Sequence, residues 1–437
     1  MSKKSNPVRH HIEDTIVPHR GYIEMKKVNK FVDENAIHPD NSPVISVRSK
    51  KVIAWLYDKI VDAGDRFETL NSSSPGISAV NIPITSVYVD LGKSYRFINK
   101  EIRAEIDGTL KIKRVCKFSV GTRKVVLAVV FPEPRHISAT EKEFSDILYK
   151  VYIWLCVAGE LSDSACSANL KIFIVMSDLK KVLPRVSSPR ILSEMNVNTA
   201  QTMSCRPTNE IHIYRREEWF KVLIHETMHA LGMDFSGASD SHMTMANKRL
   251  KKTFPFANPD LRIYESYCEV WAEIINTLFC VYLSPRTSTV VDSGTNAMRE
   301  IETRIRNEQT WSLFQCAKVI SFYGIKYNDL YSHNTETMMD VNSRYLETNT
   351  TTFSYYVAKT ILLYHIGEFL EWCAANNRNV VAFRETGTNI ASFCDFITYR
   401  CRDPTMISHI QRFDGIVKGG RRHSEVMRTM RMSLNEN

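Results

Sequence analysis

The stretch WFKVLIHETMHALGMDF, residues 219–235, carries two histidines four positions apart, with a glutamate directly after the first. Apart from these three residues, positions 222–231 are uncharged, and no proline interrupts them. Glu217 and Glu218 precede the core of the stretch, where acidic side chains suit the positive end of a helix, and Gly232 stands where the helix should stop. The pattern predicts a buried helix with two histidines on one face.

The spacing of His225, Glu226 and His229 predicts a metal centre. Residues four apart project from the same helix face, so both imidazoles can direct a ring nitrogen at one ion about 2 Å away. Glu226 lies one residue round the helix and can reach a water on that ion without being a ligand. Buried histidines satisfied by polar neighbours are the alternative. We expect Zn²⁺, with His225 and His229 as ligands and Glu226 as the general base.

A third metal ligand has to come from another segment, because hydrolytic zinc sites usually have three protein ligands and one open position. In the extended pattern HExxHxxGxxH, the last histidine would stand at position 235, which is Phe235 here. Asp234 is one residue out of register with that pattern. His242, in a polar segment further on, is a further candidate.

A second expected helix, residues 258–283, supplies a better source. In its stretch YESYCEVWAE, Glu265, Glu269 and Glu273 are spaced by four. Carboxylates at this spacing share one helix face and repel one another, and no basic residue follows Arg262 in the helix to separate them. A cation opposite the face would relieve the repulsion and the cost of burial. The alternative is an acidic face that points to solvent or pairs with basic residues elsewhere.

HExxH followed by a glutamate on a later helix resembles the gluzincin branch of the zincin metallopeptidases. The stretch EVWAE is similar to the Glu-x-x-Ala-Glu of the catalytic domain of the anthrax lethal factor type, and similar in spacing to the Glu-x-x-x-Asp of the thermolysin type. The resemblance implies that Glu269 is the third zinc ligand and that Glu273 orients a zinc-bound His225 or His229. Glutamate at 273 departs from the aspartate of the thermolysin type.

The resemblance also implies an activity, the hydrolysis of peptide bonds in a protein or peptide substrate. Zinc would acidify a water, Glu226 would take its proton, and the same carboxyl would pass it to the leaving amine. We expect Glu226→Gln to keep zinc and abolish hydrolysis. Glu265 is the competing third ligand, so we also expect Glu269→Ala to lower zinc occupancy more than Glu265→Ala.

Stabilising the oxyanion of such a reaction requires a hydrogen-bond donor. Tyr264 and Tyr267 lie near the ligand helix and are candidates, as is His242; ordinary aromatic packing is the alternative for the two tyrosines. The resemblance covers residues 169–283, and zincins usually place an edge strand beside the cleft that binds substrate as an additional strand. The stretches NVNTAQTMS (196–204) and NEIHIYR (209–215) are both candidates for that edge. The chain is also similar to uncharacterised HExxH proteins of large DNA viruses.

The fold expected is α+β, with a zincin-like core made of a small mixed sheet and the active-site helix. We expect four parts: an irregular arm (1–50), a β-rich domain (51–135), the zincin-like core (136–290) and a mainly helical C-terminal lobe with a basic tail (291–437). The local expectations are a helix over 49–64, a hairpin turning at Asp107 and Gly108, a helix over 140–158 capped by Thr140, a strand over 169–178, and a loop over 234–258.

Composition fits a folded protein that acts inside the cell. The chain has 437 residues, 43% of them hydrophobic, and its net charge of +9 permits attraction to acidic partners without requiring it. No secretory signal and no apolar run long enough to span a bilayer is present, so we expect an intracellular, cytoplasmic protein without a membrane partner. The ten cysteines form no CxxC pair and are expected to be reduced thiols.

Two other classes of function remain open. A catalytically inactive zincin-fold protein could serve a structural or interaction role, although an intact Glu226 argues against an ion held for structure alone. A nucleic-acid-binding protein would rest on the net charge and on the stretch KGGRRH (418–423), but no binding module accompanies them, so nucleic acid is not the partner we expect.

Overall fold

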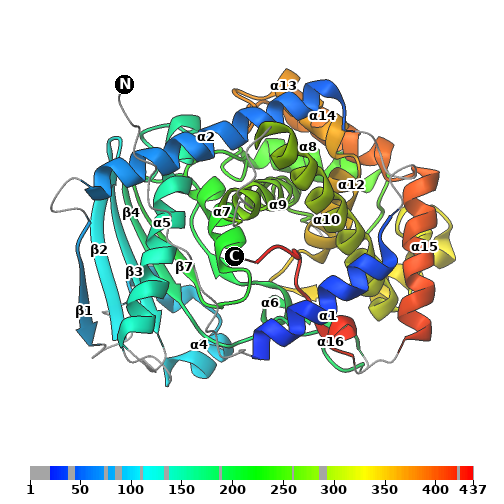
Figure 1. Ribbon diagram of the computed structural model, residues 1–437. Helices are drawn as coiled ribbons and strands as arrows, with labels where there is room; N and C mark the ends of the chain where they lie inside the picture. Colours follow the sequence, from blue (N-terminus) through cyan, green and yellow to red (C-terminus); the bar gives the residue numbers. More distant parts are fainter. Residues whose placement is uncertain are drawn as a thin grey trace.

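A computed structural model describes residues 20–37, 45–72, 77–83, 91–108, 112–131, 137–186, 189–257, 260–284, 293–420 and 424–436 of the chain. The expected α+β class is confirmed, because a mixed sheet lies on one side of the molecule and helices make up most of the rest (Figure 1). The helix that carries the two histidines lies between these two parts.

The main sheet has the strand order β1-β2-β3-β4-β7-β6. The β1-β2, β2-β3 and β7-β6 pairs are antiparallel, and β3, β4 and β7 are parallel. Since β3 pairs with β4, the sheet runs across residue 135, where the sequence suggests a domain boundary. A separate parallel pair joins β5 to β8. The strands are β1 (Ala79–Pro83), β2 (Ile112–Val120), β3 (Arg123–Phe131), β4 (Asn169–Val175), β5 (Ile191–Ser193), β6 (Ala200–Gln201), β7 (Thr208–Ile213) and β8 (Leu346–Thr348).

Helices surround the sheet and fill the C-terminal half. They are α1 (Arg20–Asn35), α2 (Val47–Ser72), α4 (Lys100–Asp107), α5 (Ile137–Leu161), α6 (Glu194–Val197), α7 (Trp219–Ala230), α8 (Asp240–Lys251), α9 (Tyr264–Leu283), α10 (Ser293–Tyr323), α11 (Thr335–Arg344), α12 (Lys359–Tyr364), α13 (Ile366–Asn376), α14 (Gly387–Arg400), α15 (Pro404–Gly419) and α16 (Glu425–Arg428). Shorter turns are the 3₁₀-helices η2 (Lys93–Phe97) and η3 (Tyr327–Tyr331) and the π-helix η4 (Phe353–Ala358).

Both faces of the sheet are buried, which explains why β3 and β4 consist mostly of apolar residues. Leu127 and Ile172 belong to the main core, which includes the crossover helix α5 and continues through α7 and α9 into the C-terminal helices. Ala128 and Phe173 alternate with them and join a smaller core with residues of η2 and α4. The active-site helix expected from the sequence is therefore part of a continuous interior.

The hairpin expected at Asp107 and Gly108 is wrong. These residues end α4, in which Ile102 and Ile106 are buried one turn apart. β2 and β3 form the hairpin, and it turns at Gly121, whose φ of +55° glycine adopts readily. Burial of a helical apolar pair outweighed the local turn signal of Asp-Gly.

Two segments expected to be irregular contain helices. The arm expected over residues 1–50 is wrong for residues 20–35, which form α1, and residues 1–19 lie outside the described part of the chain. The loop expected over 234–258 contains α8, whose N-terminus is capped by the hydroxyl of Ser239. In both segments the helix buries only one face, so most of its residues are polar and the sequence resembles irregular chain.

Three expected helices differ at their ends. α2 continues past Gly64 because this glycine lies against Tyr282, where a Cβ atom would be 1.9 Å from the hydroxyl oxygen. α5 begins before Thr140, so this residue is not its cap. α9 begins at Tyr264, later than expected, and Pro259 lies outside the described residues.

The expectation that all ten cysteines are reduced is wrong for one pair. Cys166 and Cys205, 39 positions apart, form a disulfide with their Cα atoms 4.9 Å apart, and the other eight cysteines are buried as thiols. No sequence spacing marks this pair because two separate loops bring it together.

Among the described residues, no helix combines the length and apolar character needed to cross a bilayer. In the basic stretch KGGRRH, Lys418 and Gly419 end α15, and residues 421–423 lie outside the described chain.

Candidate metal centre

Contacts with distant segments hold α7 at both ends. At its start, Glu218 has a φ of +57°, and its carboxylate accepts a hydrogen bond of 2.7 Å from the backbone N–H of Ser433. That residue belongs to the C-terminal strap, residues 429–436, which returns to the interior beside α7 (Figure 1). At its end, the backbone N–H of Cys205 donates to the carbonyl of His229 over 3.1 Å. α7 is buried along its length, so its histidines face the protein interior.

Three ligand-type atoms meet between α7 and α9. The Nε2 atoms of His225 and His229 are 3.1 Å apart, and Oε2 of Glu265 lies 3.0 Å from the first and 3.3 Å from the second. In a tetrahedral zinc site with bonds of about 2.0–2.1 Å, ligand atoms lie roughly 3.3 Å from one another. The triangle therefore has the size that one such ion requires, and its nitrogen and oxygen donors suit zinc.

A carboxylate lies on the far side of each ring, and that of Asp234 is hydrogen-bonded to His229, whereas Nδ1 of His225 makes no hydrogen bond to the described residues. Nδ1 of His229 lies 2.7 Å from Oδ2 of Asp234, and Nδ1 of His225 lies 2.9 Å from Oε2 of Glu269. The other oxygen of Glu269 contacts the ammonium of Lys221. Such carboxylate–histidine contacts fix ring orientation and raise the basicity of the opposite nitrogen in metal sites. Both Nε2 atoms are thereby directed at Glu265.

The charges around the triangle favour a cation. Burial lowers the pKa of His225, but contacts with Glu265 and Glu269 outweigh it and raise this pKa to about 9. Burial likewise opposes the shift at His229, where Cys268, Asp234 and Glu265 raise the pKa well above its usual value. Protons and divalent cations compete for the same imidazole lone pairs. Without metal, protons on the histidines take the place that a divalent ion can fill.

A second group of possible ligands shares His229 but fits an ion less well. Asp234 and Cys268 lie on the Nδ1 side of this histidine, with the Cys268 sulfur 3.7 Å from that nitrogen. Burial raises the pKa of the Cys268 thiol well above its usual value, which disfavours the thiolate that binds metal. The group around Glu265 is preferred because it uses both histidines of the motif.

Glu226, the expected base, lines a cavity next to His225. Among the described residues its carboxylate has no hydrogen-bond or ion-pair partner, and it lines a cavity of about 30 Å³ together with His225 and Tyr355. A water molecule requires about 10–15 Å³ of such space, so the cavity has room for water beside the carboxylate. Burial raises the pKa of Glu226, as suits a group that accepts and returns a proton.

Tyr355 contributes a hydroxyl to the same cavity. It lies on the π-helix η4, an element often found at functional sites, and its hydroxyl donates a hydrogen bond of 3.0 Å to Oε2 of Glu265. Its ring centre lies 6.1 Å from that of His225. No motif in the sequence pointed to this residue, which stands 90 positions after Glu265.

The sheet edge borders the cavity as well. The segment 196–204 shortens to the two-residue strand β6, preceded by α6, and its Thr199 and Ala200 line the cavity. The other candidate edge, residues 209–215, provides β7, which lies between β4 and β6. Of the two stretches, the first therefore lies at the edge and beside Glu226.

The structure places the expected third ligand and its partner elsewhere. Glu269 does not join the triangle, because its carboxylate lies on the Nδ1 side of His225 and contacts Lys221. Glu273 contacts neither histidine, and its Oε1 lies 2.7 Å from Nζ of Lys359. The roles drawn from the resemblance are thus shifted by one turn: Glu265 has the position expected of Glu269, and Glu269 has the position expected of Glu273.

The other candidates lie outside the triangle. The hydroxyl of Tyr267 donates to the carbonyl of Val381 over 2.6 Å, and the ring of Tyr264 packs edge-on to His229 at 5.9 Å. His242 lies on α8 against Gly387. Phe235, at the ligand position of the extended motif, is buried in an aromatic cluster.

Besides Tyr355, the motifs give no role to three residues that contact the histidines or the carboxylate face: Lys221, Asp234 and Lys359. Lys221 is four residues before His225 and therefore on its helix face, a signal that could have identified it. Asp234 was noted only as out of register, yet five residues past His229 it can fold back onto that ring. Lys359 comes from α12, and no spacing relates it to α9.

Comparisons with known proteins identify no family. No family model matches the chain, and no solved structure is similar to it. The chain is similar to an uncharacterized protein, R210, of Acanthamoeba polyphaga mimivirus, with 22% identity over 188 residues. The match covers 43% of this chain and 44% of the viral protein, so less than half of that protein's length is spanned. Function has to be argued from the site itself.

Proposed function

We propose that the protein is a zinc-dependent peptidase whose metal ligands are His225, His229 and Glu265. The observation that carries this proposal is the triangle of their donor atoms, with sides of 3.0–3.3 Å, beside a buried carboxylate that has no partner among the described residues. Helical proximity explains why the two histidines are close. It does not explain why a third donor from another helix lies at the same distance from both.

The residues around the cavity can divide the work of hydrolysis. A bound zinc ion would supply a Lewis acid that polarises a carbonyl and acidifies water. Glu226 can accept a proton at its carboxylate and return it to a leaving amine. The hydroxyl of Tyr355 is a donor near the reacting atoms, and edge strand β6 can hold an extended peptide by backbone hydrogen bonds. The substrate class is therefore a protein or peptide.

The inactive zincin-fold alternative explains less of the site. A purely structural ion needs closed coordination and no base, whereas Glu226 lies at a cavity large enough for water. The nucleic-acid alternative rests on net charge and on the stretch KGGRRH, of which residues 421–423 lie outside the described chain. We propose that the protein acts inside the cell, where its eight buried thiols stay reduced and its one disulfide among the described residues, Cys166–Cys205, can be opened.

A peptide-library digest tests the proposal. Purified protein is incubated with a mixed peptide library and the products are read by mass spectrometry, before and after chelation and after adding Zn²⁺ back. We expect the wild type to cleave peptides, with the chelator abolishing cleavage and added zinc restoring it. The Glu226→Gln protein should show no cleavage in any of the three conditions. Zinc binding without any cleavage would instead favour the inactive alternative, and cleavage that survives chelation would contradict the proposal.

A further inference from the structure

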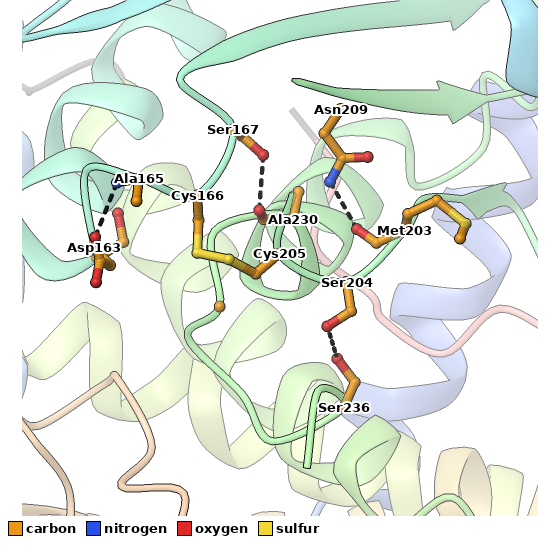
Figure 2. Close-up of a disulfide and its surroundings, with 12 residues drawn as sticks. Asp163, Ala165, Cys166, Ser167, Met203, Ser204, Cys205, Asn209, Ala230 and Ser236 are labelled. Atoms are coloured by element: carbon orange, nitrogen blue, oxygen red, sulfur yellow. Dashed lines mark hydrogen bonds between the residues drawn. A yellow bond between two sulfur atoms is a disulfide. The ribbon is translucent and has the colours of Figure 1, made fainter. Parts of the chain in front are cut away.

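The disulfide lies against the C-terminal end of α7, the helix that carries the two histidines. Cys166 stands in the loop between α5 and β4, and Cys205 stands in the loop between β6 and β7 (Figure 2). Asn209 braces the second loop through a hydrogen bond of 2.7 Å from its side chain to the carbonyl of Met203. The bond therefore ties two loops of the sheet to each other at the point where α7 ends.

Both disulfide loops bond to the last carbonyl groups of α7. The backbone N–H of Cys205 donates to the carbonyl of His229 over 3.1 Å. From the other loop, the hydroxyl of Ser167 donates to the carbonyl of Ala230 over 2.7 Å. The carbonyl of His229 also accepts from the backbone N–H of Gly232 over 3.1 Å, so the two loop donors add to the local bonds that hold the final turn.

The turn after α7 packs on the disulfide itself. Gly232 has a φ of +62°, and a Cβ atom built on it would lie 3.1 Å from the sulfur of Cys166 and 3.3 Å from Cβ of Cys205. Only glycine suits both the positive φ and this close approach. The helix end and the disulfide are thus in direct contact.

A chain of hydrogen bonds links the same loop to the side chain of His229. The hydroxyls of Ser204 and Ser236 are 2.9 Å apart, and Ser236 donates to Asp234 from its hydroxyl over 3.0 Å. Asp234 in turn lies 2.7 Å from Nδ1 of His229. The residue next to Cys205 therefore helps to hold the carboxylate that orients a proposed zinc ligand.

We propose that the Cys166–Cys205 disulfide is a redox-sensitive clamp that holds His229 in its metal-binding orientation, and that its reduction weakens zinc binding. The inference rests on the proposed zinc site. The two loops that the disulfide joins make three separate contacts that support the proposal. They contact the backbone of α7, they contact Gly232, and through Ser204 they contact the residues that hold Asp234, the partner of His229. Losing a group that orients a metal ligand typically lowers metal affinity about 10- to 100-fold.

A dithiol reductant can open the bond from its exposed side. Cys205 is exposed, whereas Cys166 and the eight thiol cysteines are buried. A thiolate of the dithiol attacks the Cys205 sulfur, and Cys166 leaves as a thiolate that takes up a proton. The second thiol of the reductant then attacks the mixed disulfide and releases Cys205. Overall, the protein gains two electrons and two protons, and the dithiol becomes a disulfide.

The test measures zinc affinity of the full chain with the disulfide closed and open. Zinc affinity is measured by competition with a chromogenic chelator, before and after the disulfide is reduced with a phosphine. The phosphine is oxidised to its oxide, with an oxygen atom from water. It is chosen because it offers no thiolate that could bind the metal. We expect two additional titratable thiols and a roughly tenfold loss of affinity. The matched control is Cys166→Ser/Cys205→Ser, which should resemble the reduced wild type and show no response to the phosphine.

Hydrogen exchange of the metal-free protein gives a second readout that does not depend on zinc. Amides of residues 229–236 should exchange at least several times faster after reduction, while those of α15, which packs against α10, should not change. Faster exchange without zinc binding in either state would refute the proposed zinc site, and would keep only the effect of the disulfide on the end of α7. Equal zinc affinity in the two states, or no gain of thiols on reduction, would overturn the clamp itself.

Discussion

The carboxylate face of α9 has two ends that look alike in sequence and differ in structure. At one end, Oε2 of Glu265 lies 3.0 Å and 3.3 Å from the Nε2 atoms of His225 and His229. At the other end, two turns later, Oε1 of Glu273 lies 2.7 Å from Nζ of Lys359. Glu265 is 13% exposed and Glu273 is fully buried, but the larger difference lies in the partner.

The nature of the partner determines what each end can do. An ammonium group offers no lone pair to a metal, whereas an imidazole can release a proton and present one. The Glu265 end can therefore exchange protons for a divalent ion, while the Glu273 end already holds its counter-charge. Glu269 lies between them and contacts both kinds of partner, His225 and Lys221. Under the proposed assignment, one carboxylate face combines a metal-binding end with a structural one.

The largest effect is expected from Glu226→Gln, which tests whether the Glu265 end functions in catalysis. An amide cannot accept the proton, so hydrolysis of a peptide found in the library digest should fall about 10³- to 10⁴-fold. Zinc content should be unchanged, because Glu226 is not in the triangle. Measuring kcat/KM and zinc content on the same samples checks both expectations, the loss of hydrolysis and the unchanged zinc content. Hydrolysis at the wild-type rate would show that Glu226 is not the base.

Glu273→Ala should break the structural end and spare the functional one. The variant leaves Lys359 buried without its carboxylate, which typically costs about 3–5 kcal/mol in unfolding free energy. Chemical denaturation measures this loss, and zinc per folded chain should stay at the wild-type value. The control is Glu273→Leu with Lys359→Met, which replaces the pair by apolar groups and should recover most of the stability. A Glu273→Ala protein that is fully stable but lacks zinc would reverse the assignment of the two ends.

Tyr355→Phe removes the hydroxyl that donates to Glu265 and lines the cavity. Loss of one donor near the developing charge typically costs about 10²-fold in kcat. We expect that loss, with KM and zinc content close to wild type. Tyr264→Phe is the matched control, since its ring packs against His229 without being in the cavity lining, and its kcat should change little. Equal losses in the two variants would argue against a specific role for Tyr355.

The smallest effect is expected from Glu269→Gln, at the middle of the face. The amide no longer balances Lys221 or orients His225 by charge, so zinc affinity should fall about 10- to 100-fold while saturating zinc still fills the site. A chelator competition measures the affinity. Complete loss of zinc at saturation would make Glu269 a ligand, as the resemblance to gluzincins implies.

One half of the site could be predicted from the sequence because helix geometry alone fixes it. His225, Glu226 and His229 share a continuous helix, and the carboxylate helix was identified by its spacing. The choice between Glu265 and Glu269 was not accessible, because it depends on how far α9 is shifted along α7, which distant packing sets. Tyr355 and Lys359 arrive from the C-terminal half, and no local pattern indicates where those segments return.

The fold shows the same division. β3 and β4 were recognisable because strands covered on both faces are almost wholly apolar. α1 and α8 were taken for irregular chain, because a helix that packs by one side keeps a polar composition. The disulfide joins loops that only the assembled sheet brings together. Continuous apolar patterns predicted the buried helices and strands, whereas the turn expected at Asp107 and Gly108 and the links between distant segments were decided by packing.

Zinc content of the wild type and of Glu265→Ala tests the central claim most directly. After dialysis against zinc-free buffer, elemental analysis should find about one zinc per wild-type chain and almost none in Glu265→Ala, since hydrolytic zinc sites usually need three protein ligands. Glu269→Ala, compared under saturating zinc, should still bind close to one. A zinc-free wild type, or full occupancy in Glu265→Ala, would contradict the proposal that these three side chains hold a single ion.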